Sequence, residues 1–324
     1  MKKLAILLLS VLLFAGEVKI IQENLDDQYV SAIDKASFAI MVDKKRFFKY
    51  LPSLMNSLNA YYMQKGIDYN ITVYDINTSV DEIPYHDIIY LATNPDKLYT
   101  LANYPNKRFY IPLINKNEFN VSLNNLYFGS IDFKAQLKKL YSYTVGENKI
   151  ISVNQHSILS EKLNKDLKEI VPNQITSYYY PSINYDDLNQ SYVFFNTSAG
   201  KTAQILSTAT QKEVSPILEF TTQIDFDPLL IILTQPEDIK KLLIANSIIN
   251  PPRNIEDYCE LLNSNIRYNW LNYAALIFAN KIYNMQNGED RFFMQDFHRY
   301  IFENQINYPI KIYKIDKGAF VEVR

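Results

Sequence analysis

Short apolar runs alternate with helix-patterned segments along most of this chain, and that alternation constrains the fold most strongly. The run Ser37–Val42 ends at Asp43, as buried parallel strands often do. The next segment repeats apolar residues at three- and four-residue steps up to Gly66, which stands where a helix C-cap belongs. Strands separated by helices form βαβ units, so the sequence predicts an α/β fold with mostly parallel sheets flanked by helices.

The same alternation continues to the C-terminal part. Strands are expected at 70–75, 87–92, 108–114, 127–129, 149–153, 175–180, 191–195 and 217–222. The apolar run Leu229–Leu233 is strand-sized, and a helix is predicted over 237–245. Apolar and polar residues then alternate over 309–315 and 319–323, on either side of Asp316-Lys317-Gly318, which predicts a C-terminal β-hairpin.

The first sixteen residues have the pattern of a secretory signal peptide. Lys2-Lys3 precede an apolar run, Leu4–Phe14, which ends at the small pair Ala15-Gly16. The run is shorter than the ~20 apolar residues that span a bilayer. Residues 1–16 are therefore interpreted as a signal peptide, and the mature protein is expected in the periplasm, secreted across a bacterial inner membrane. No cysteine follows the run, so the signal for lipid attachment is missing.

The length of the mature chain predicts two lobes. Of 324 residues, 324 − 16 = 308 remain after cleavage, more than the ~100–200 residues of one domain. We expect a polar lead-in over 17–35, an N-terminal α/β lobe over 36–150 and a C-terminal α/β lobe over 151–324. No low-complexity linker separates them, so the boundary should consist of chain crossovers inside the fold.

Composition excludes several classes of function. The 33 basic and 35 acidic residues give a net charge of -2 with no long block of one sign, which argues against a nucleic-acid partner. Only 7 glycines occur, which argues against a glycine-rich cofactor cradle. The three histidines and the single cysteine stand far apart, so neither a metal site nor an internal disulfide is expected: His86, His156, His298 and Cys259. We expect no cofactor, no metal and no enzyme activity.

One strand-to-helix junction has candidate binding chemistry. Thr197-Ser198-Ala199-Gly200-Lys201-Thr202 ends like a phosphate-binding loop, but Phe195 stands where that motif requires its first glycine. Two other interpretations remain. Hydroxyls and amides at a helix N-terminus hold anions such as carboxylates, and Thr197 or Ser198 could equally be a plain N-cap.

Other loops that follow strands carry similar polar residues. Thr93 and Asn94, Ser130 and Ser157 each come after an expected strand. In open α/β sheets ligands bind at the carboxyl ends of the strands, so these loops are where a cleft would be built.

The order and spacing of these units resemble the type I periplasmic-binding-protein fold of amino-acid-binding transporter subunits. Ser37–Asp43 is similar to the first strand of the N-terminal lobe, and Tyr192–Thr202 is similar to a strand, loop and helix of the C-terminal lobe. Leu229–Ala245 resembles a later strand-helix unit, and Asn272–Ala275 resembles the start of a late helix that carries Tyr-Asp-Ala.

The resemblance implies a non-enzymatic protein that captures a small solute between two lobes by hinge bending. In that family the Asp of Tyr-Asp-Ala helps to grip the ligand ammonium, and Ala274 occupies its place here, which argues against a free amino acid. Tyr273 is then expected to offer an aromatic wall. The expected ligand-binding residues are Thr93, Asn94, Ser130, Ser157, Thr197, Ser198 and Tyr273.

A second function is compatible with the same resemblance. The fold also occurs in outer-membrane lipoproteins that activate peptidoglycan synthases, where it binds a protein partner. The chain could therefore be a cell-envelope interaction module. A plugged cleft and an exposed apolar patch elsewhere would favour this alternative.

Overall fold

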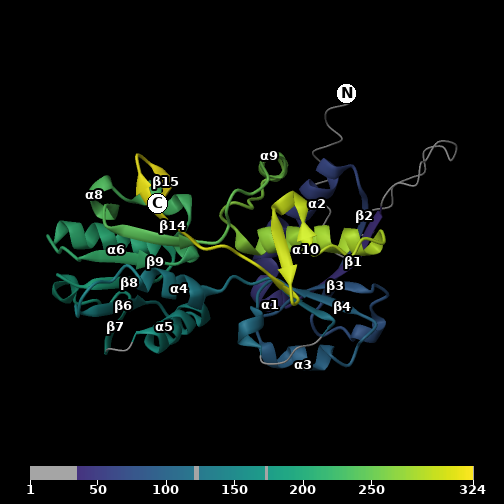
Figure 1. The fold of residues 1–324 in the computed structure, drawn as a ribbon, viewed down its shortest axis with the longest axis horizontal. Coiled ribbons are helices and arrows are strands. Elements are labelled where there is room, and N and C mark those ends of the chain that lie inside the picture. Colours follow the sequence, from purple (N-terminus) through teal and green to yellow (C-terminus); the bar gives the residue numbers. More distant parts are fainter. Residues whose placement is uncertain (1–34, 120–123, 172–173, 324) are drawn as a thin grey trace. The chain divides into compact units, whose positions relative to one another are not determined.

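The computed structural model describes residues 35–119, 124–171 and 174–323 and divides the chain into two α/β units (Figure 1). Unit 1 comprises the described residues up to Ser130 together with Pro252–Asn265 and Leu271–Ile306. Unit 2 comprises Ile131–Pro251, Ile266–Trp270 and Asn307–Arg324. The division therefore comes twenty residues before the expected boundary at 150, and the C-terminal half returns to unit 1 through crossovers. The expected signal peptide and nearly all of the lead-in lie outside the described residues.

Unit 1 is built on a sheet whose central strands are parallel. Its eight strands follow one another in the order β11 (Phe293–Met294), β12 (Arg299–Phe302), β13 (Gln305–Ile306), β5 (Leu126–Phe128), β4 (Arg108–Ile111), β3 (Asp87–Leu91), β1 (Lys35–Val42) and β2 (Asp68–Asp75). Only the β11–β12 and β12–β13 pairs are antiparallel. The five strands that come first in the chain thus have the order 2-1-3-4-5.

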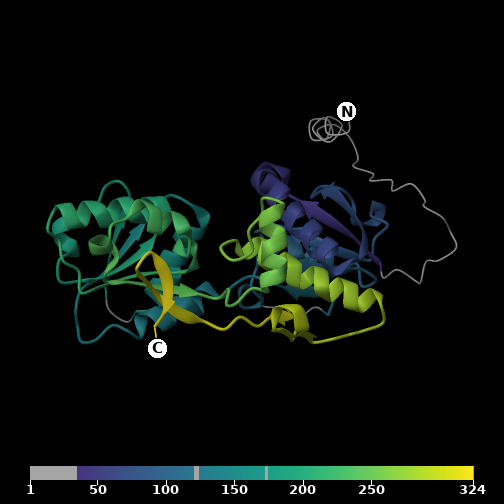
Figure 2. The ribbon, with the colours of Figure 1, turned by 90° about the horizontal axis from the view of Figure 1, so that it is seen from above.

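Helices cover the sheet of unit 1, and they come from distant parts of the sequence. They are α1 (Lys44–Phe47), α2 (Leu51–Lys65), α3 (Leu98–Leu101), α9 (Arg253–Leu261) and most of α10 (Trp270–Gln286). Figures 1 and 2 show α10 beside the strands of unit 1, and the ring of Phe278 lies 5.3 Å from that of Tyr110 in β4. Helix α2 ends at Gly66, as predicted, because glycine adopts the left-handed conformation, here with φ of 65°, without a steric penalty.

Unit 2 repeats the same strand order. Its seven strands are β15 (Ala319–Glu322), β14 (Lys311–Asp316), β10 (Leu242–Asn246), β9 (Leu218–Thr221), β8 (Tyr192–Asn196), β6 (Ile150–Asn154) and β7 (Ile175–Tyr179). The strands from β6 to β10 are parallel and again follow the order 2-1-3-4-5. The predicted C-terminal hairpin is confirmed as the antiparallel pair β14–β15, with Lys317 and Gly318 at positive φ in the turn.

Helices lie on both faces of the unit 2 sheet. They are α4 (Phe133–Tyr141), α5 (Ile158–Ile170), α6 (Ala199–Gln211), α7 (Pro228–Leu233) and α8 (Pro236–Ile239). Side chains alternate between the faces: Ile151 and Val193 pack with α6, whereas Ile150 and Phe194 pack with α4 and α5. Because β6 and β8 are buried on both faces, they appear in the sequence as unbroken apolar runs.

Two predicted elements of unit 2 are wrong. Leu229–Leu233 forms the helix α7 rather than a strand, because Pro228 opens a helical turn that the Asp227 side chain caps. The helix predicted over 237–245 ends at Ile239, and its second half is the buried strand β10. Within the described residues, no helix has the length and hydropathy needed to cross a membrane.

Candidate functional site

The strand order defines a switch point in each unit, where the chain connections depart in opposite directions from two adjacent strands. In unit 2 these strands are β6 and β8, which end at Asn154 and Asn196. In unit 1 they are β1 and β3. Ligands of open α/β sheets bind at the carboxyl ends of such strands, so convergent polar groups at a switch point mark a candidate site.

Buried amides join the two strand ends at the switch point of unit 2. The Nδ2 atom of Asn196 donates to Oδ1 of Asn154 at 2.9 Å and to Oγ of Ser152 at 3.1 Å. Neither asparagine has more than 1% of its surface exposed. Burying an amide is costly unless it is hydrogen-bonded, so these bonds fix the geometry of the strand ends.

A chain of hydroxyl groups ties the next two loops together around one carboxylate. Thr197 and Thr202 share a hydrogen bond of 2.7 Å between their Oγ1 atoms. Thr202 and Thr221 then both donate to Oδ2 of Asp225, at 2.7 and 2.8 Å. Asp225 is fully buried in the short 3-10 helix that follows β9, and its burial raises the pKa of the carboxyl to about 7. The carboxyl can therefore change its charge near neutral pH.

A second buried cluster links helix α4 to the loops after β9 and β10. The Nε2 atom of Gln136 donates to Oγ of Ser247 at 2.8 Å, and its Oε1 accepts from the backbone of Gln223 at 3.0 Å. The Oε1 atom of Gln223 accepts in turn from the backbone N–H of Ser247 at 2.8 Å. Polar side chains thus line the carboxyl edge of the sheet from β6 across to β10.

Several atoms of this edge have no hydrogen-bond partner among the described residues. They belong to side chains that are otherwise bonded or fully enclosed: Oδ1 of Asn196, Oγ1 of Thr222, Nε2 of Gln223 and Oδ1 of Asp225. A buried polar atom without a partner costs ~1–3 kcal/mol. Ordered water or a polar ligand would complete these bonds.

Three of the expected ligand-binding residues lie at this switch point. Ser157 caps helix α5 by accepting from the backbone N–H of Ser160, and Thr197 is fully buried in the hydroxyl chain. Ser198 stands at the N-cap position of α6 and is exposed, but its side chain makes no capping bond. Capping of α6 by Ser198 is therefore wrong, and the Thr197 hydroxyl bonds the Thr202 hydroxyl.

Three further expected residues lie at the carboxyl edge of unit 1. Thr93 accepts from Nη1 of Arg46 at 2.9 Å, and the Asn94 side chain caps the short 3-10 helix Pro95–Lys97. Ser130 is buried after β5, where its backbone oxygen accepts from Asn115 at 2.9 Å. Thr93 and Asn94 are exposed, so this edge is open to solvent where that of unit 2 is enclosed.

The seventh expected residue, Tyr273, lies in the core of unit 1. It is fully buried in α10, with its ring edge-on to Phe297 at 5.7 Å and beneath the guanidinium of Arg299. Burial raises the pKa of its phenol. Ala274, the residue in place of the family's aspartate, is also fully buried in α10.

Sequence reasoning missed most of the buried residues of the unit 2 site. Asp225 and Asp227 stand two residues apart, but only Asp227 caps α7, whereas Asp225 lies in the buried hydroxyl network. One signal could have found the asparagines: the parallel strands β6, β8 and β10 all end in asparagine, at 154, 196 and 246. In the described part of the chain, no three acidic, histidine or cysteine side chains are grouped closely enough to hold a metal.

Comparison with solved structures gives the class to which this architecture corresponds, the two-lobed fold of type I periplasmic binding proteins. A branched-chain amino acid transporter protein from Thermus thermophilus with bound valine is 14% identical, with a TM-score of 0.63, over 90% of this chain and 96% of that one. The leucine-binding protein LivK from Thermotoga maritima is 10% identical, with a TM-score of 0.59, over 89% and 98%.

LpoA of Haemophilus influenzae has the same fold within a longer chain. It is 9% identical, with a TM-score of 0.57, over 90% of this chain and 59% of that one. No protein-family model matches the sequence. No curated protein matches it either. The fold is therefore established, whereas the ligand must be argued from the site.

Proposed function

We propose that this chain is an exported, non-enzymatic binding protein that captures a small polar solute at the switch point of unit 2. The observation that supports the proposal most is the set of buried polar atoms without partners at that edge. The solute-binding neighbours, one of them with valine bound, share the fold and support the same reading.

The unpartnered atoms define the chemistry of the solute. The Oδ1 atom of Asn196 is always an acceptor, and Oδ1 of Asp225 is an acceptor when the carboxylate is ionised. Both atoms therefore require hydrogen-bond donors on the solute. The Nε2 atom of Gln223 requires an acceptor. A solute with an amino or hydroxyl group on one side and a carbonyl or carboxylate on the other satisfies both.

Helix α6 adds a preference for a negative group. Its first turn carries no acidic residue and its N-cap makes no side-chain capping bond, so the exposed Ser198 hydroxyl remains available. The positive end of a helix dipole stabilises an anion by ~0.3–1 kcal/mol. We infer that the solute places a carboxylate or a carbonyl there.

The sharpest test removes an unpartnered atom without removing any internal bond. Thr222→Val deletes only a hydroxyl that has no partner in the described structure, and it keeps the shape of the side chain. We expect calorimetric titration with valine, isoleucine, glutamine and dipeptides to find a solute that binds the wild-type protein, and to show at least tenfold weaker binding to Thr222→Val. Thr208→Val, which changes a half-buried threonine on α6 whose hydroxyl bonds the Gln204 backbone oxygen, is the control.

Two results would contradict the proposal. One is equal affinity of the wild type and Thr222→Val for every solute that binds. The other is the absence of binding by any of these solutes together with no co-purified small molecule, because a solute-binding protein is stabilised by its ligand.

One observation favours the alternative, an interaction module of the cell envelope. Helix α7 exposes three apolar side chains next to the same edge: Leu229, Ile232 and Leu233 are 43%, 74% and 51% exposed. Exposed apolar clusters of this kind mark protein contacts. LpoA, which has the same fold, supports this second candidate.

The two candidates differ in what would contact α7. A photo-crosslinking residue at position 232 in the living cell should capture one defined envelope protein if α7 is a docking surface. A matched probe at Val145, which is 74% exposed elsewhere in unit 2, should not capture it. Equal labelling from both positions would remove the support for the interaction module.

A further inference from the structure

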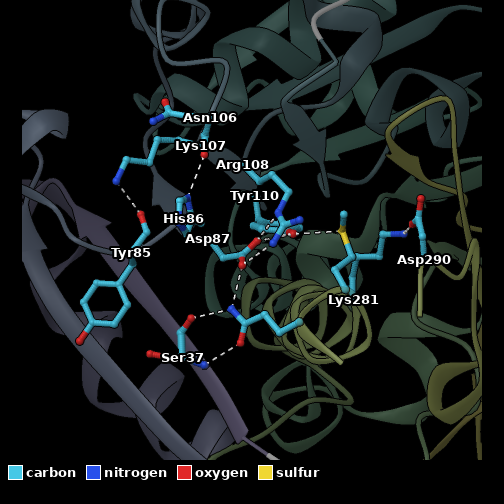
Figure 3. Close-up of polar contacts among 12 residues, drawn as sticks. Ser37, Tyr85, His86, Asp87, Asn106, Lys107, Arg108, Tyr110, Lys281 and Asp290 are labelled. Atoms are coloured by element: carbon cyan, nitrogen blue, oxygen red, sulfur yellow. Dashed lines mark hydrogen bonds and ion pairs between the residues drawn. The ribbon is translucent and has the colours of Figure 1, made fainter. Parts of the chain in front are cut away.

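Unit 1 has a charged cluster at the amino edge of its sheet, opposite the edge where the switch point lies. Asp87 and Arg108 are the first residues of β3 and β4, and Ser37 lies near the start of β1 (Figure 3). The register pairs Asp87 with Arg108 side by side on adjacent parallel strands. The late helix α10 adds Gln286 to this group.

Every oxygen of the Asp87 carboxylate is engaged. Its Oδ1 accepts from Nε of Arg108 at 2.7 Å and from the Tyr110 hydroxyl at 2.9 Å. Its Oδ2 accepts from Nη2 of Arg108 at 2.8 Å and from Nε2 of Gln286 at 2.7 Å. Gln286 in turn bonds both backbone groups of Ser37. The fully buried carboxylate therefore fixes the guanidinium in one orientation.

The guanidinium keeps free donors toward solvent. A guanidinium has five N–H groups, and Asp87 takes two of them, so 5 − 2 = 3 have no partner among the described residues. The side chain of Arg108 is 30% exposed. Its hydrogen bond to Asp87 raises its pKa further, so the group stays charged.

The local charge around this guanidinium is positive. Lys107, next in the chain, is buried, and its Nζ donates to the backbone oxygens of Ile83 and Tyr85 at 2.5 and 2.8 Å. No carboxylate pairs with Lys107 in the part of the chain that is described. Lys107, Arg108 and Asp87 together carry +1 + 1 − 1 = +1, which favours an anion over a neutral or cationic group.

A pocket opens directly on the free side of Arg108. It has a volume of about 570 Å³ and is lined by Ser37, Pro84, Tyr85, His86, Asp87, Pro105, Asn106, Arg108 and Gln286. Two prolines give it apolar walls, and Asp87 is the acidic residue in this lining. A pocket of this size holds a small organic molecule, with the guanidinium at one end to orient it.

We propose that this pocket is a second binding site, specific for a small organic carboxylate whose oxygens take the free N–H groups of Arg108 and whose ring or chain lies against Pro84 and Pro105. Asp87 is a positioning residue, since it holds the guanidinium without touching the ligand. The site is independent of the solute site proposed in unit 2, because it uses another unit and the opposite sheet edge.

Benzoate is the first compound to titrate, because it joins a carboxylate to a flat ring. We expect the wild-type protein to bind benzoate in calorimetry or by ligand-observed NMR, and to bind the neutral isostere benzamide and the cation benzylamine at least tenfold more weakly. Benzamide keeps the ring and loses the charge, so this comparison isolates the role of the guanidinium.

Charge changes at the pocket mouth test the site without disturbing the buried ion pair. Asn106 is exposed, and its backbone oxygen, not its side chain, faces Nδ1 of His86. Asn106→Glu should weaken benzoate binding about tenfold, whereas Asn106→Lys should strengthen it. Asn196→Ala, in unit 2, should leave benzoate binding unchanged and so separate this site from the solute site.

A second pair of variants tests the guanidinium itself. Arg108→Lys keeps the positive charge but loses the planar guanidinium that donates two parallel hydrogen bonds. The double variant Asp87→Asn with Arg108→Gln removes both charges together. Arg108→Lys should reduce the preference for benzoate over benzamide, because one ammonium group cannot bond both carboxylate oxygens as a guanidinium does, and the double variant should abolish the preference. The proposal is overturned if wild-type protein fails to distinguish benzoate from benzamide, or if Asn106→Glu and Asn106→Lys bind benzoate equally.

Discussion

The two units share the strand order 2-1-3-4-5, and they complete the switch point with different chemistry. In unit 1 the segment after β1 carries Asp43 and, in α1, Arg46, and both are partly exposed. The Nε atom of Arg46 lies 3.6 Å from Oδ2 of Asp43, and its Nη1 donates to Thr93. In unit 2 the corresponding place is a buried set of amides around Asn154 and Asn196. An exposed ion pair changes the free energy of unfolding little. A buried amide destabilises the fold unless its hydrogen-bond partners lie at bonding distance.

The location of buried charge differs in the same way. Unit 1 buries its carboxylate, Asp87, at the amino edge with every oxygen engaged. Unit 2 buries Asp225 at the carboxyl edge with one oxygen unpartnered, and it also buries Glu219 near the amino end of β9. A common topology therefore supplies two edges per sheet, and the two units place buried carboxylates in different surroundings at these edges.

The largest effect is expected from breaking the buried ion pair of unit 1. Asp87→Ala leaves the Arg108 guanidinium without its partner, and such a loss costs ~3–5 kcal/mol. Hydrogen exchange followed by mass spectrometry should show loss of protection in β3 and β4. Asp68→Ala, at an exposed position on the edge strand β2, is the control. Unchanged protection in Asp87→Ala would mean that the ion pair is not a structural joint.

The pH dependence of unit 2 should be the next largest effect. The pKa of Asp225 is about 7 in the folded chain and ~3.9 when unfolded, so the native state binds the extra proton between these values. Its stabilising contribution is full below pH ~4 and is lost as the pH rises through about 7. Relative to Asp225→Asn, the wild type should therefore lose a few kcal/mol in urea unfolding between pH 4 and 8.

Glu219 provides an internal reference for that experiment. It is buried at the opposite end of β9, and burial raises its pKa to about 8, so Asp225→Asn should still lose stability as the pH rises toward 8. Only the double variant with Glu219→Gln should lose both contributions. Parallel curves for the wild type and Asp225→Asn would show that Asp225 titrates normally.

A pair of truncations compares the two switch points directly. Asn196→Ala removes two buried hydrogen bonds and should cost ~1–3 kcal/mol of unfolding free energy. Thr93→Ala removes one exposed bond and should stay within ~0.5 kcal/mol. Equal effects in urea unfolding would mean that the enclosed edge of unit 2 is no more tightly built than the open edge of unit 1.

The smallest expected effect is a difference in stability between variants of two serines, Ser157 and Ser198. Each stands at the N-cap position of a helix in unit 2. Ser157 caps α5, so Ser157→Ala should cost ~1 kcal/mol. Ser198 makes no capping bond, so Ser198→Ala should change the stability of the free protein by only a few tenths of a kcal/mol. A larger loss in Ser198→Ala than in Ser157→Ala, measured by thermal unfolding, would contradict the capping assignment.

The sequence was sufficient for the fold class because parallel strands buried on both faces appear as apolar runs, as β6 and β8 do. It was insufficient for α7, since five consecutive apolar residues fit a buried strand as well as a short helix, and Pro228 decided between them. The boundary between units also escaped prediction, because the return of α9 and α10 to unit 1 depends on packing between distant segments.

The sequence indicated which loops follow the strands at the switch points, but it did not indicate which buried side chains meet there. Residues expected at loops after strands, such as Thr197 and Thr93, do lie at the switch points. Tyr273 could not be placed, because an aromatic residue in an apolar helix suits both a core and a wall, and it lies in the core. Asp225 was missed because its burial arises only when α6 and β9 supply Thr202 and Thr221.

The central claim, that the unit 2 switch point holds a solute, is tested most directly by native mass spectrometry of wild-type protein and Thr222→Val purified side by side. Thr222→Val loses no internal bond and removes an unpartnered buried hydroxyl, so the free variant should be at least as stable as the wild type. We predict that the wild type carries a bound small molecule and that Thr222→Val carries markedly less of it. Equal occupancy in the two proteins, or none in either, would contradict the account.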